Sequence, residues 1–401
     1  MDDSSEAASE SAGVAFANQL RLCLIDLEDP RVVGRCDHLL FDIVAITLLA
    51  VMCGAEDWTD VEDFAEVRED WLRGFLELPG GVPSHDTFGR VIGLLEADQF
   101  AACLFEWTRA LHEATGIRNE TIAIDGKTLR RSKNRAGGML HLVTAWASQN
   151  GLTLGQVAVA KKSGEAVAIP RLLELLSLKG TTVTLDAGGT QTAIAEQIRR
   201  QKGHYVLAVK GNQKTLKADM QALFDEASSV DFEGYRHAEH SEGSSGCLQR
   251  RHGRIEERCC HVLEVPKDHP QRSKWKDLRT LVVTISRREI KGVESYESRL
   301  FISSHPPPQK GRTAKMLATA IRRHWSIENS QHWVLDVAFD EDRRRQQDRN
   351  AAANLAAVRR LAVSLLHQEK TVKKGAKCKR MRCALEPGYL FTVLNAANFD
   401  A

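Results

Sequence analysis

The chain has 401 residues and a formal net charge of +2, and it is long enough for two or three domains that each bury a core. Its nine cysteines include no C-x-x-C pair, and its acidic start, MDDSSEAASESAG, is unlike a secretory leader. These features exclude a disulfide-rich secreted protein and predict a cytoplasmic one.

Charge is divided unevenly along the chain. Residues 1–120 contain 8 Lys and Arg against 24 Asp and Glu, whereas residues 121–401 contain 47 against 29. An acidic front and a basic remainder predict that a polyanion binds the later two-thirds of the chain. The alternative for any single cluster is a solvated surface with no partner.

The first part of the chain is predicted to be helical. Residues 1–14 are poor in apolar side chains, which predicts disorder, and residues 15–118 carry the apolar spacing of an N-terminal all-helical domain. The run Leu39–Cys53 is about 15 residues long and contains Asp42, so it predicts a core helix rather than a membrane span. A helix capped by Ser84 follows the break PGGVPSHDTF, and it either reads DNA in a helix-turn-helix or simply packs. The acidic surroundings favour packing.

Strand and helix signals alternate from about residue 119. Strands are predicted at TIAIDG, TTVTLDA and HYVLAVKG, a hairpin at MLHLVTAWASQNGLTLGQVAVAKK, and helices at 165–178, 190–201 and 214–227. Polar β-leaning stretches predict a β-rich insertion over about 232–305, and Thr313–Asp336 predicts one long helix. The predicted fold class is α/β, a mixed sheet with flanking helices over 119–345. A C-terminal helix and a basic tail follow over 346–401.

Three acidic residues stand where such a fold could bring them together. Asp125 and Asp186 each end a predicted apolar strand, and Glu328 lies in the predicted long helix. Three clustered carboxylates repel one another by roughly 4 kcal/mol per close pair at ~4 Å, so a cation is needed to hold them. The set can bind two Mg²⁺ ions roughly 3.5–4 Å apart, with Mn²⁺ as the alternative ion. A single Asp after a strand is more often a turn residue, so the hypothesis depends on all three.

Basic, polar and aromatic residues lie next to these acids in the sequence, and we expect them to contact DNA. They are Lys127, Arg130, Arg131, Lys210, Asn212, Lys214, Arg322, Arg323, His324, Trp325, Asn329, His332, Arg343, Arg344 and Arg345. The histidines are more often packed in a core, and burial is expected for at least one of Trp325 and Trp333.

Long stretches of the chain resemble the ISAs-type insertion-sequence DDE transposases, the group that includes the H-repeat-associated proteins. The resemblance covers roughly residues 27–370. It is carried by DPRVVGRCDHLLFDIVAITLLAVMCGAEDW, GGVPSHDTF, AIDGKTLRRS, HLVTAWASQNGLTLGQVAVAKKS, TLDAGGTQ, YVLAVKGNQ, HGRIEER and RRHWSIENSQHWVLDVAFDEDRRR.

This resemblance implies an RNase H-like catalytic core in which Asp125, Asp186 and Glu328 bind the metal ions. It implies a β-rich insertion before Glu328, and double-stranded DNA as the partner, both the terminal inverted repeats and the target. Strand transfer at two ends implies at least a homodimer in the DNA complex, in a bacterial cytoplasm at the nucleoid and with no membrane contact. Two rivals stay open: an RNase H-like nuclease without strand transfer, and a catalytically inactive DNA-binding descendant.

The chain departs from the family pattern at a few positions. It has Gly188, Gly189 and Thr190 where the family usually has M-G-C, and Lys162–Glu165 where the family has K-S-N-E. In the wider group with a Y-R-E-K signature, a Tyr, an Arg and a Lys would fall at Ile321, His324 and Leu335. The ISAs-type proteins also carry His in place of that Arg.

Overall fold

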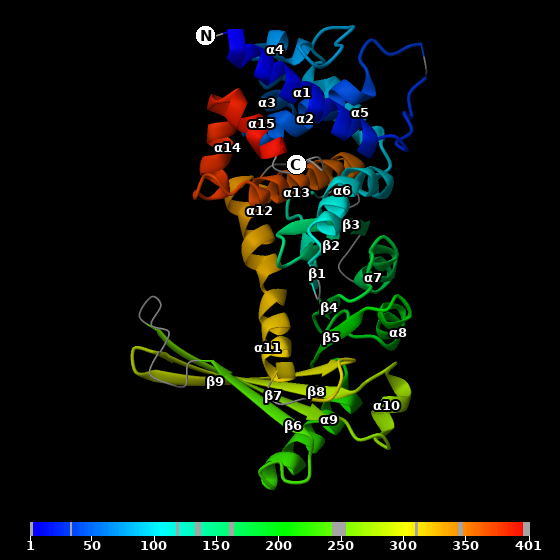
Figure 1. The fold of residues 1–401 in the computed structure, drawn as a ribbon. Coiled ribbons are helices and arrows are strands. Elements are labelled where there is room, and N and C mark those ends of the chain that lie inside the picture. The colour runs from blue at the N-terminus through cyan, green and yellow to red at the C-terminus, as the bar shows by residue number, and fades with distance from the viewer. Residues whose placement is uncertain are drawn as a thin grey trace. The chain divides into compact units, whose positions relative to one another are not determined.

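The computed structural model divides into two compact units (Figure 1). Residues 3–32, 34–117, 120–132, 138–159, 164–242, 254–308, 312–343 and 348–395 are described. Unit 1 contains residues 1–117, 126–176 and 327–401, and unit 2 contains residues 118–125 and 177–326. The chain therefore leaves unit 1 and returns to it twice.

Unit 1 is mainly helical. Its N-terminal helices are α1 (Asp3–Cys23), α2 (Leu40–Cys53), α3 (Trp58–Val67), α4 (Glu69–Arg73), α5 (His85–Leu94) and α6 (Ala97–Ala114). Helix α1 includes most of the segment whose composition favours disorder. The predicted core helix is confirmed, because α2 is buried continuously from Asp42 to Met52. Among the described residues, no helix is long and apolar enough to cross a membrane.

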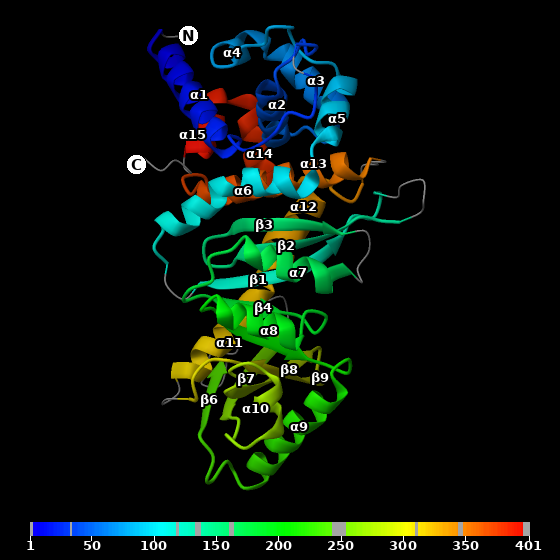
Figure 2. The same ribbon diagram turned by 90° about the vertical axis from the view of Figure 1, so that its right-hand side faces the viewer.

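Helix α13 (Arg349–Gln368) is the centre of unit 1. Asp348 caps its N-terminus by accepting a hydrogen bond from the Ala351 backbone N–H at 2.7 Å. Most of its own side chains are small or aliphatic and cover all sides of the helix, and residues 351–366 are buried throughout. It packs against α2, α5 and α6, and against strand β3 of a hairpin (Figure 2). Helices α14 (Ala376–Leu385) and α15 (Pro387–Asn395) complete this unit.

The basic tail predicted after α13 is partly built into the core of unit 1. Lys379 and Arg380 of α14 are buried. The Lys379 ammonium pairs with Glu369 at 3.0 Å, and the Arg380 guanidinium donates to the Val51 carbonyl oxygen at the end of α2. These two cations anchor the C-terminal helices and are not a solvated surface.

The predicted hairpin is confirmed as β2 (His141–Ala147) and β3 (Leu152–Val159), which pair antiparallel. Gly151 in the turn has φ +69°, a left-handed conformation that glycine adopts without strain. Helix α7 (Glu165–Glu174) covers the hairpin, and at Gly155 an added Cβ would lie 2.8 Å from a Leu172 methyl group.

A mixed sheet forms the body of unit 2. Its strands are β1 (Thr121–Thr128, of which 121–125 lie in this unit), β4 (Thr182–Leu185), β5 (His204–Val209), β6 (His237–Glu242), β7 (Arg254–Glu264), β8 (Thr280–Ile290) and β9 (Val293–Ser303). They lie in the order β1-β4-β5-β9-β8-β7-β6. The first three are parallel to one another, and each later strand is antiparallel to its neighbour. The prediction of a mixed sheet with flanking helices is confirmed.

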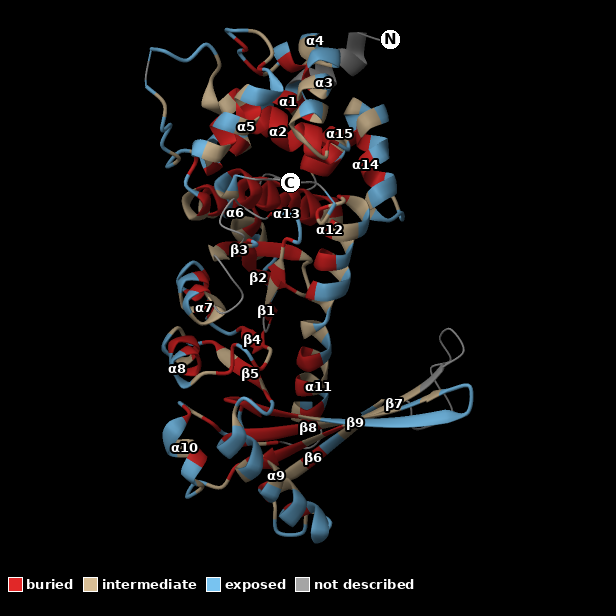
Figure 3. Ribbon diagram, turned by 180° about the vertical axis from the view of Figure 1, so that it is seen from behind, coloured by how far each residue is buried: buried red, intermediate tan, exposed pale blue. Residues whose placement is uncertain are grey.

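The predicted β-rich insertion consists of β6 to β9, and it continues the sheet rather than forming a separate body. Strand β9 pairs with β5 from Val206↔Ser303 to Val209↔Leu300. The inner ends of β8 and β9 are buried. Their outer ends are joined at Lys291 and Gly292, where β9 is exposed and β8 is mostly half-buried (Figure 3).

The helices of unit 2 in the described part of the chain are α8 (Thr192–Arg200), α9 (Lys214–Ser229), α10 (Pro270–Lys274) and α11 (Arg312–His324). Helix α11 crosses one face of the sheet and contacts β4, β5, β6 and β7. Its apolar residues Ala314, Leu317 and Ile321 pack there against Val262 and Phe301.

The prediction of a single long helix over Thr313–Asp336 is wrong. Helix α11 ends at His324, a turn follows at Trp325, and residues Glu328–His332 form a π-helical segment, η2, before α12 (Trp333–Ala338). A π-helix takes wider turns than an α-helix, so the period of 3.6 that predicts an ordinary helix does not hold over Glu328–His332. The apolar spacing that predicted helix here is real, but it does not reveal the interruption.

Candidate active site

Asp125 and Asp186 are neighbours in unit 2. Ile124 of β1 pairs in parallel register with Leu185 of β4, so the next residue of each strand is one of these two acids. Adjacent strands lie about 4.8 Å apart, and paired residues of parallel strands point to the same face. Both carboxylates are half-buried. The predicted strand-end position holds for Asp186, which follows the last residue of β4, but not for Asp125, because β1 continues to Thr128. Each acid is nevertheless the first residue beyond the paired stretch of β1 and β4.

The loop after β4 orients the Asp186 carboxylate. Its Oδ1 accepts hydrogen bonds from the backbone N–H groups of Gly188 at 2.9 Å and Gly189 at 3.2 Å. Thr190 donates its hydroxyl to the Ala208 carbonyl oxygen of β5 at 2.6 Å, which ties the loop to the next strand. Small residues at 188 and 189 allow this close turn, which sequence reasoning registered only as a departure from the family pattern.

Residues after β5 support the same loop. Asn212 donates from its side-chain amide to the Ala187 carbonyl oxygen at 2.6 Å, and Gln213 donates to the Thr190 carbonyl oxygen at 2.7 Å. Asn212 therefore positions the Asp186 loop, a role that its place in the sequence did not indicate. Lys210 and Lys214 beside it are exposed.

Helix α11 lies on the face to which Asp125 and Asp186 point. Thr184, two residues before Asp186 and so on the same face, hydrogen-bonds to Nδ1 of His324 at 3.0 Å. Sequence reasoning missed Thr184; a polar residue two positions from the strand-end acid was the available signal. Arg322, at the end of this helix, pairs with Glu242 of β6.

Glu328 and His332 lie in the π-helical segment of unit 1. The Glu328 side chain is 52% exposed, and its Oε2 lies 3.5 Å from Nδ1 of the buried His332. The segment is held by Gln331, which donates to the Thr153 hydroxyl at 2.6 Å, and by His367 Nε2, which lies 3.0 Å from the Ser330 carbonyl oxygen. π-Helical segments occur often at functional sites because they change where side chains point.

Lys127 is placed differently from the expectation of a phosphate ligand. It is buried, and its ammonium lies 2.5 Å from Asp336, 4.0 Å from Glu341 and 3.9 Å from Asp342. A lysine held by three carboxylates within unit 1 is not available at the surface. Asp342 also accepts a hydrogen bond from the Arg130 backbone N–H at 3.3 Å, and its Oδ2 pairs with Arg130 Nε at 3.2 Å.

The remaining predicted DNA ligands differ in exposure. Arg130, Arg131, Lys210, Asn212, Lys214, Arg322, Trp325, Asn329 and Arg343 are exposed, and Arg323 and His324 are half-buried. Arg344 and Arg345 lie outside the described residues. The expected burial of one tryptophan is wrong, because Trp325 is 47% and Trp333 61% exposed. The Arg299 guanidinium lies over the Trp325 ring, 5.1 Å from its centre.

Two family models cover most of the chain. The transposase DDE domain matches residues 117–365, and the DDE_Tnp_1-associated domain matches residues 22–108. The first match contains all three predicted acids.

Relatives of full length agree with these matches. The candidate transposase YncI of Escherichia coli O157:H7 is 40% identical over 92% of this chain and 92% of its own length. The H repeat-associated candidate transposase YhhI of Escherichia coli K12 is 37% identical over 92% of this chain and 95% of its own.

A solved structure, a piggyBac transposase synaptic complex with hairpin DNA, covers 98% of this chain and 83% of that one, with 11% identity and a TM-score of 0.40. That likeness is too weak to support an argument. The family matches and the full-length relatives show that the chain belongs to the transposase family with a DDE domain, together with the H repeat-associated proteins.

Proposed function

We propose that this chain is the transposase of a bacterial insertion sequence. It binds the inverted repeats at the ends of its element, hydrolyses the phosphodiester at each end, and joins the freed 3′-hydroxyl to target DNA. Asp125, Asp186 and Glu328 hold the catalytic divalent ions. Joining two ends to one target requires at least a dimer in the DNA complex.

The shared register of Asp125 and Asp186, each one residue beyond the last pair of β1 and β4, carries this proposal. Ligands of open α/β sheets bind near the carboxyl ends of parallel strands. Asp186 lies just beyond the end of β4, and Asp125 lies in β1 just beyond the last residue that pairs with β4. The chain order also supports an RNase H-like core: β1 is followed by the β2–β3 hairpin, then by β4 and β5, which lie parallel to β1.

Covalent geometry limits how far Glu328 can be from this face. His324 hydrogen-bonds to Thr184 of β4, and Glu328 follows four residues later. Four residues span at most roughly 14 Å when fully extended. The chain itself therefore keeps the Cα atom of Glu328 within roughly 14 Å of that of His324.

The donor set suits Mg²⁺. All three residues offer carboxylate oxygens, the hard ligands that this ion prefers. Asp186 uses Oδ1 for the turn, and among the described residues its Oδ2 accepts no hydrogen bond, so that oxygen can serve as a ligand. Bound divalent ions would lower the pKa of the attacking water or 3′-hydroxyl and stabilise the leaving oxygen.

Exposed cations around this face supply the contacts to DNA. Lys210 and Lys214 follow β5, and Arg322 lies near the end of α11, next to the half-buried Arg323. Lys and Arg bind phosphates and fix the register of a duplex, whereas the exposed ring of Trp325 can stack on an unpaired base.

The test is cleavage and joining of a labelled DNA that carries the ends of the element. The full-length protein is compared with Asp186→Asn in Mg²⁺, in Mn²⁺ and in EDTA. Asp268→Asn, an exposed carboxylate after β7, is the matched control. We expect metal-dependent nicking at the 3′ ends and joined products. Both should fall by at least about 100-fold in Asp186→Asn and persist in the control.

Other outcomes select the rivals. Cleavage without any joined product supports an RNase H-like nuclease. DNA binding without cleavage in either metal ion identifies an inactive DNA-binding descendant and contradicts the proposal. Full activity of Asp186→Asn contradicts the assigned metal ligand even if transposition is observed.

A further inference from the structure

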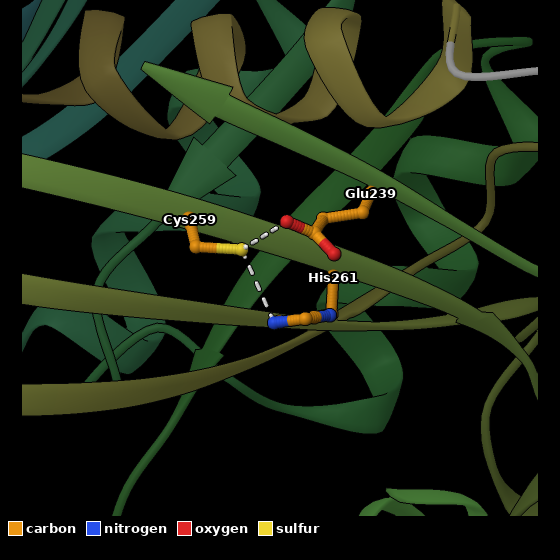
Figure 4. A group of neighbouring side chains, drawn as sticks. All are labelled: Glu239, Cys259 and His261. Atoms are coloured by element: carbon orange, nitrogen blue, oxygen red, sulfur yellow. Dashed lines mark hydrogen bonds between the residues drawn. The ribbon is translucent and has the colours of Figure 1, made fainter. Parts of the chain in front are cut away.

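Three side chains with metal-binding atoms meet on the β6–β7 hairpin, apart from the predicted acidic triad. They are Glu239 of β6 and Cys259 and His261 of β7 (Figure 4). All three ligand atoms lie within 4.8 Å of one another.

The strand register explains why these side chains meet. Glu239 lies directly opposite His261, and Ser241 lies opposite Cys259. Side chains two residues apart on a strand share a face, so Cys259 and His261 point the same way and Glu239 joins them from the neighbouring strand. The intervening Cys260 belongs to the opposite face, where it packs in the core beneath α11.

The distances suit one small cation. The Cys259 Sγ lies 3.1 Å from Glu239 Oε1 and 3.1 Å from His261 Nε2. Zinc bonds of about 2.3 Å to sulfur and about 2.0–2.1 Å to nitrogen or oxygen place tetrahedral ligands roughly 3.5 Å apart. An outward movement of each ligand by a few tenths of an ångström, within the range of a side-chain rotation, would make room for the ion.

A second histidine orients the first. His237 Nε2 lies 3.2 Å from His261 Nδ1, on the side of the ring away from Cys259. Phe232 stacks on His237 with ring centres 3.7 Å apart. When the N–H at His261 Nδ1 donates a hydrogen bond to His237 Nε2, the Nε2 atom of His261 has a free lone pair that can bind a metal. Such a partner on the far nitrogen is the usual support of a metal-bound histidine.

Protonation states agree with this geometry. Burial lowers the pKa of His261 and of His237, so both rings are neutral at physiological pH. Burial also raises the pKa of Cys259 to about 11, so without a metal the group is a thiol and not a reactive thiolate. Hydrogen bonds from Ser241 and Cys259 lower the pKa of Glu239, which is therefore ionised.

We propose that Glu239, Cys259 and His261 bind a single thiophilic divalent ion of the zinc class. Sulfur, imidazole and carboxylate together select such an ion over Mg²⁺. Binding releases one proton, because the Cys259 thiol becomes a thiolate as the metal–sulfur bond forms. With three ligands from the protein, the fourth position holds water on the exposed side of Glu239.

The ion would join the outermost strand to the rest of the sheet. β6 is the last strand in the order and pairs only with β7 among the described strands. An edge strand with one neighbour is the part of a sheet that opens most readily. Coordination from Glu239 on β6 to two residues of β7 opposes that opening.

The experiment titrates the metal-free full-length protein with Co²⁺ alone. We expect one equivalent to give a sulfur-to-cobalt charge-transfer band in the near ultraviolet and the visible bands of a four-coordinate ion. Zn²⁺ should displace both. Asp125, Asp186 and Glu328 contain no sulfur, so cobalt bound there gives no such band, and the result is independent of the proposed transposase activity.

Variants identify the ligands. Cys259→Ser should abolish the charge-transfer band, and His261→Gln should weaken Co²⁺ binding by at least about 100-fold. His237→Gln, which leaves the ligands in place, should weaken it by roughly 10- to 100-fold. Cys378→Ser removes an exposed thiol elsewhere and should leave the band unchanged.

A second measurement does not depend on whether the variants fold. Zn²⁺ should protect Cys259 of the unaltered protein from alkylation, as mapped by mass spectrometry, and leave Cys378 reactive. The proposal is overturned if no sulfur-to-cobalt band forms, if the band survives Cys259→Ser, or if Zn²⁺ gives Cys259 no protection.

Discussion

Glu341 and Arg360 form an ion pair whose two side chains are entirely buried in unit 1, with Nη1 and Oε1 2.7 Å apart. Burial alone would raise the pKa of Glu341, but Arg360 and then Lys127 outweigh it, so the pKa lies below its usual value. The carboxylate is therefore ionised at neutral pH. Two cations depend on this one buried anion.

Removing that anion is expected to destabilise unit 1. Glu341→Gln leaves the Arg360 guanidinium buried without a counter-charge, which costs about 3–5 kcal/mol of unfolding free energy. Urea unfolding followed by circular dichroism measures it. Glu69→Gln breaks the exposed pair with Arg73 and should cost less than about 1 kcal/mol. Equal losses in the two variants would contradict this account.

Residues of the candidate site were predictable only where local pattern determines their place. Asp186 follows a short β-branched strand as the pattern predicts, whereas Asp125 lies within β1, beside the residue that pairs with the end of β4. Lys127 is two residues from Asp125, yet its partners are more than 200 residues away, so its burial depends on contacts that the local sequence does not encode. Cys259 and His261 alternate on one strand and gave no zinc-type spacing to recognise.

At the scale of elements, polar side chains tie β4 and β5 to the segment that follows β9. His305 Nε2 lies 3.0 Å from the Thr182 hydroxyl, and Ser304 accepts from the Tyr205 backbone N–H at 3.0 Å. The His305 ring stacks on His204 with centres 4.2 Å apart. Burial, then His204 and Arg199, lower the pKa of His305 to about 3.

This histidine should make unit 2 sensitive to acid. Its pKa is about 3 when folded and about 6.5 when unfolded, so the unfolded chain binds the extra proton between these values. The contribution of His305 to the free energy of unfolding is fully present above pH ~6.5. It falls as the pH is lowered, by about 2 kcal/mol between pH ~7 and pH ~5. Urea unfolding at both pH values should show a smaller loss in His305→Gln.

A surface histidine provides a contrast of opposite sign. Glu62 raises the pKa of the exposed His85, so this group stabilises the protein below its unfolded pKa and loses that effect as the pH rises. In His85→Gln, the loss of unfolding free energy between pH ~7 and pH ~5 should therefore be unchanged or steeper. A shallower loss in His85→Gln than in His305→Gln would contradict the assignment.

The elements were easier to predict than their partners. Alternating apolar residues indicated β1, β4, β5 and the β2–β3 hairpin because each strand carries its own signal. The pairing of β9 with β5 joins residues nearly 100 positions apart, and a β-rich composition cannot specify such a neighbour. The π-helical segment was not predicted because the same residues are equally compatible with an ordinary α-helix.

At the scale of the whole molecule, the charge asymmetry agrees with the proposed function. Residues 121–401 contain 47 Lys and Arg against 29 Asp and Glu, although some of these cations, such as Lys127, Lys379 and Arg380, are buried. Only exposed cations can replace counterions on DNA. Lys210 and Lys214 meet that condition beside the Asp186 loop.

Removing both charges should weaken DNA binding without regard to sequence. Lys210→Gln with Lys214→Gln is expected to lower the slope of log affinity against log salt by about 2, because each phosphate contact contributes roughly 0.9. Fluorescence anisotropy with a labelled terminal repeat measures the slope. Lys267→Gln, an exposed cation after β7, is the control, and an unchanged slope in the double variant would exclude these contacts.

The burial of α13 has a consequence for synthesis. Residues 351–366 provide the surface on which α2, α5 and α6 pack, yet they leave the ribosome more than 230 residues after α6. Helices α2, α5 and α6 therefore keep an apolar face exposed while the strands between α6 and α13 are synthesised. A nascent chain of this design needs protection, and any premature stop before residue 349 leaves its earliest helices without the partner that completes them.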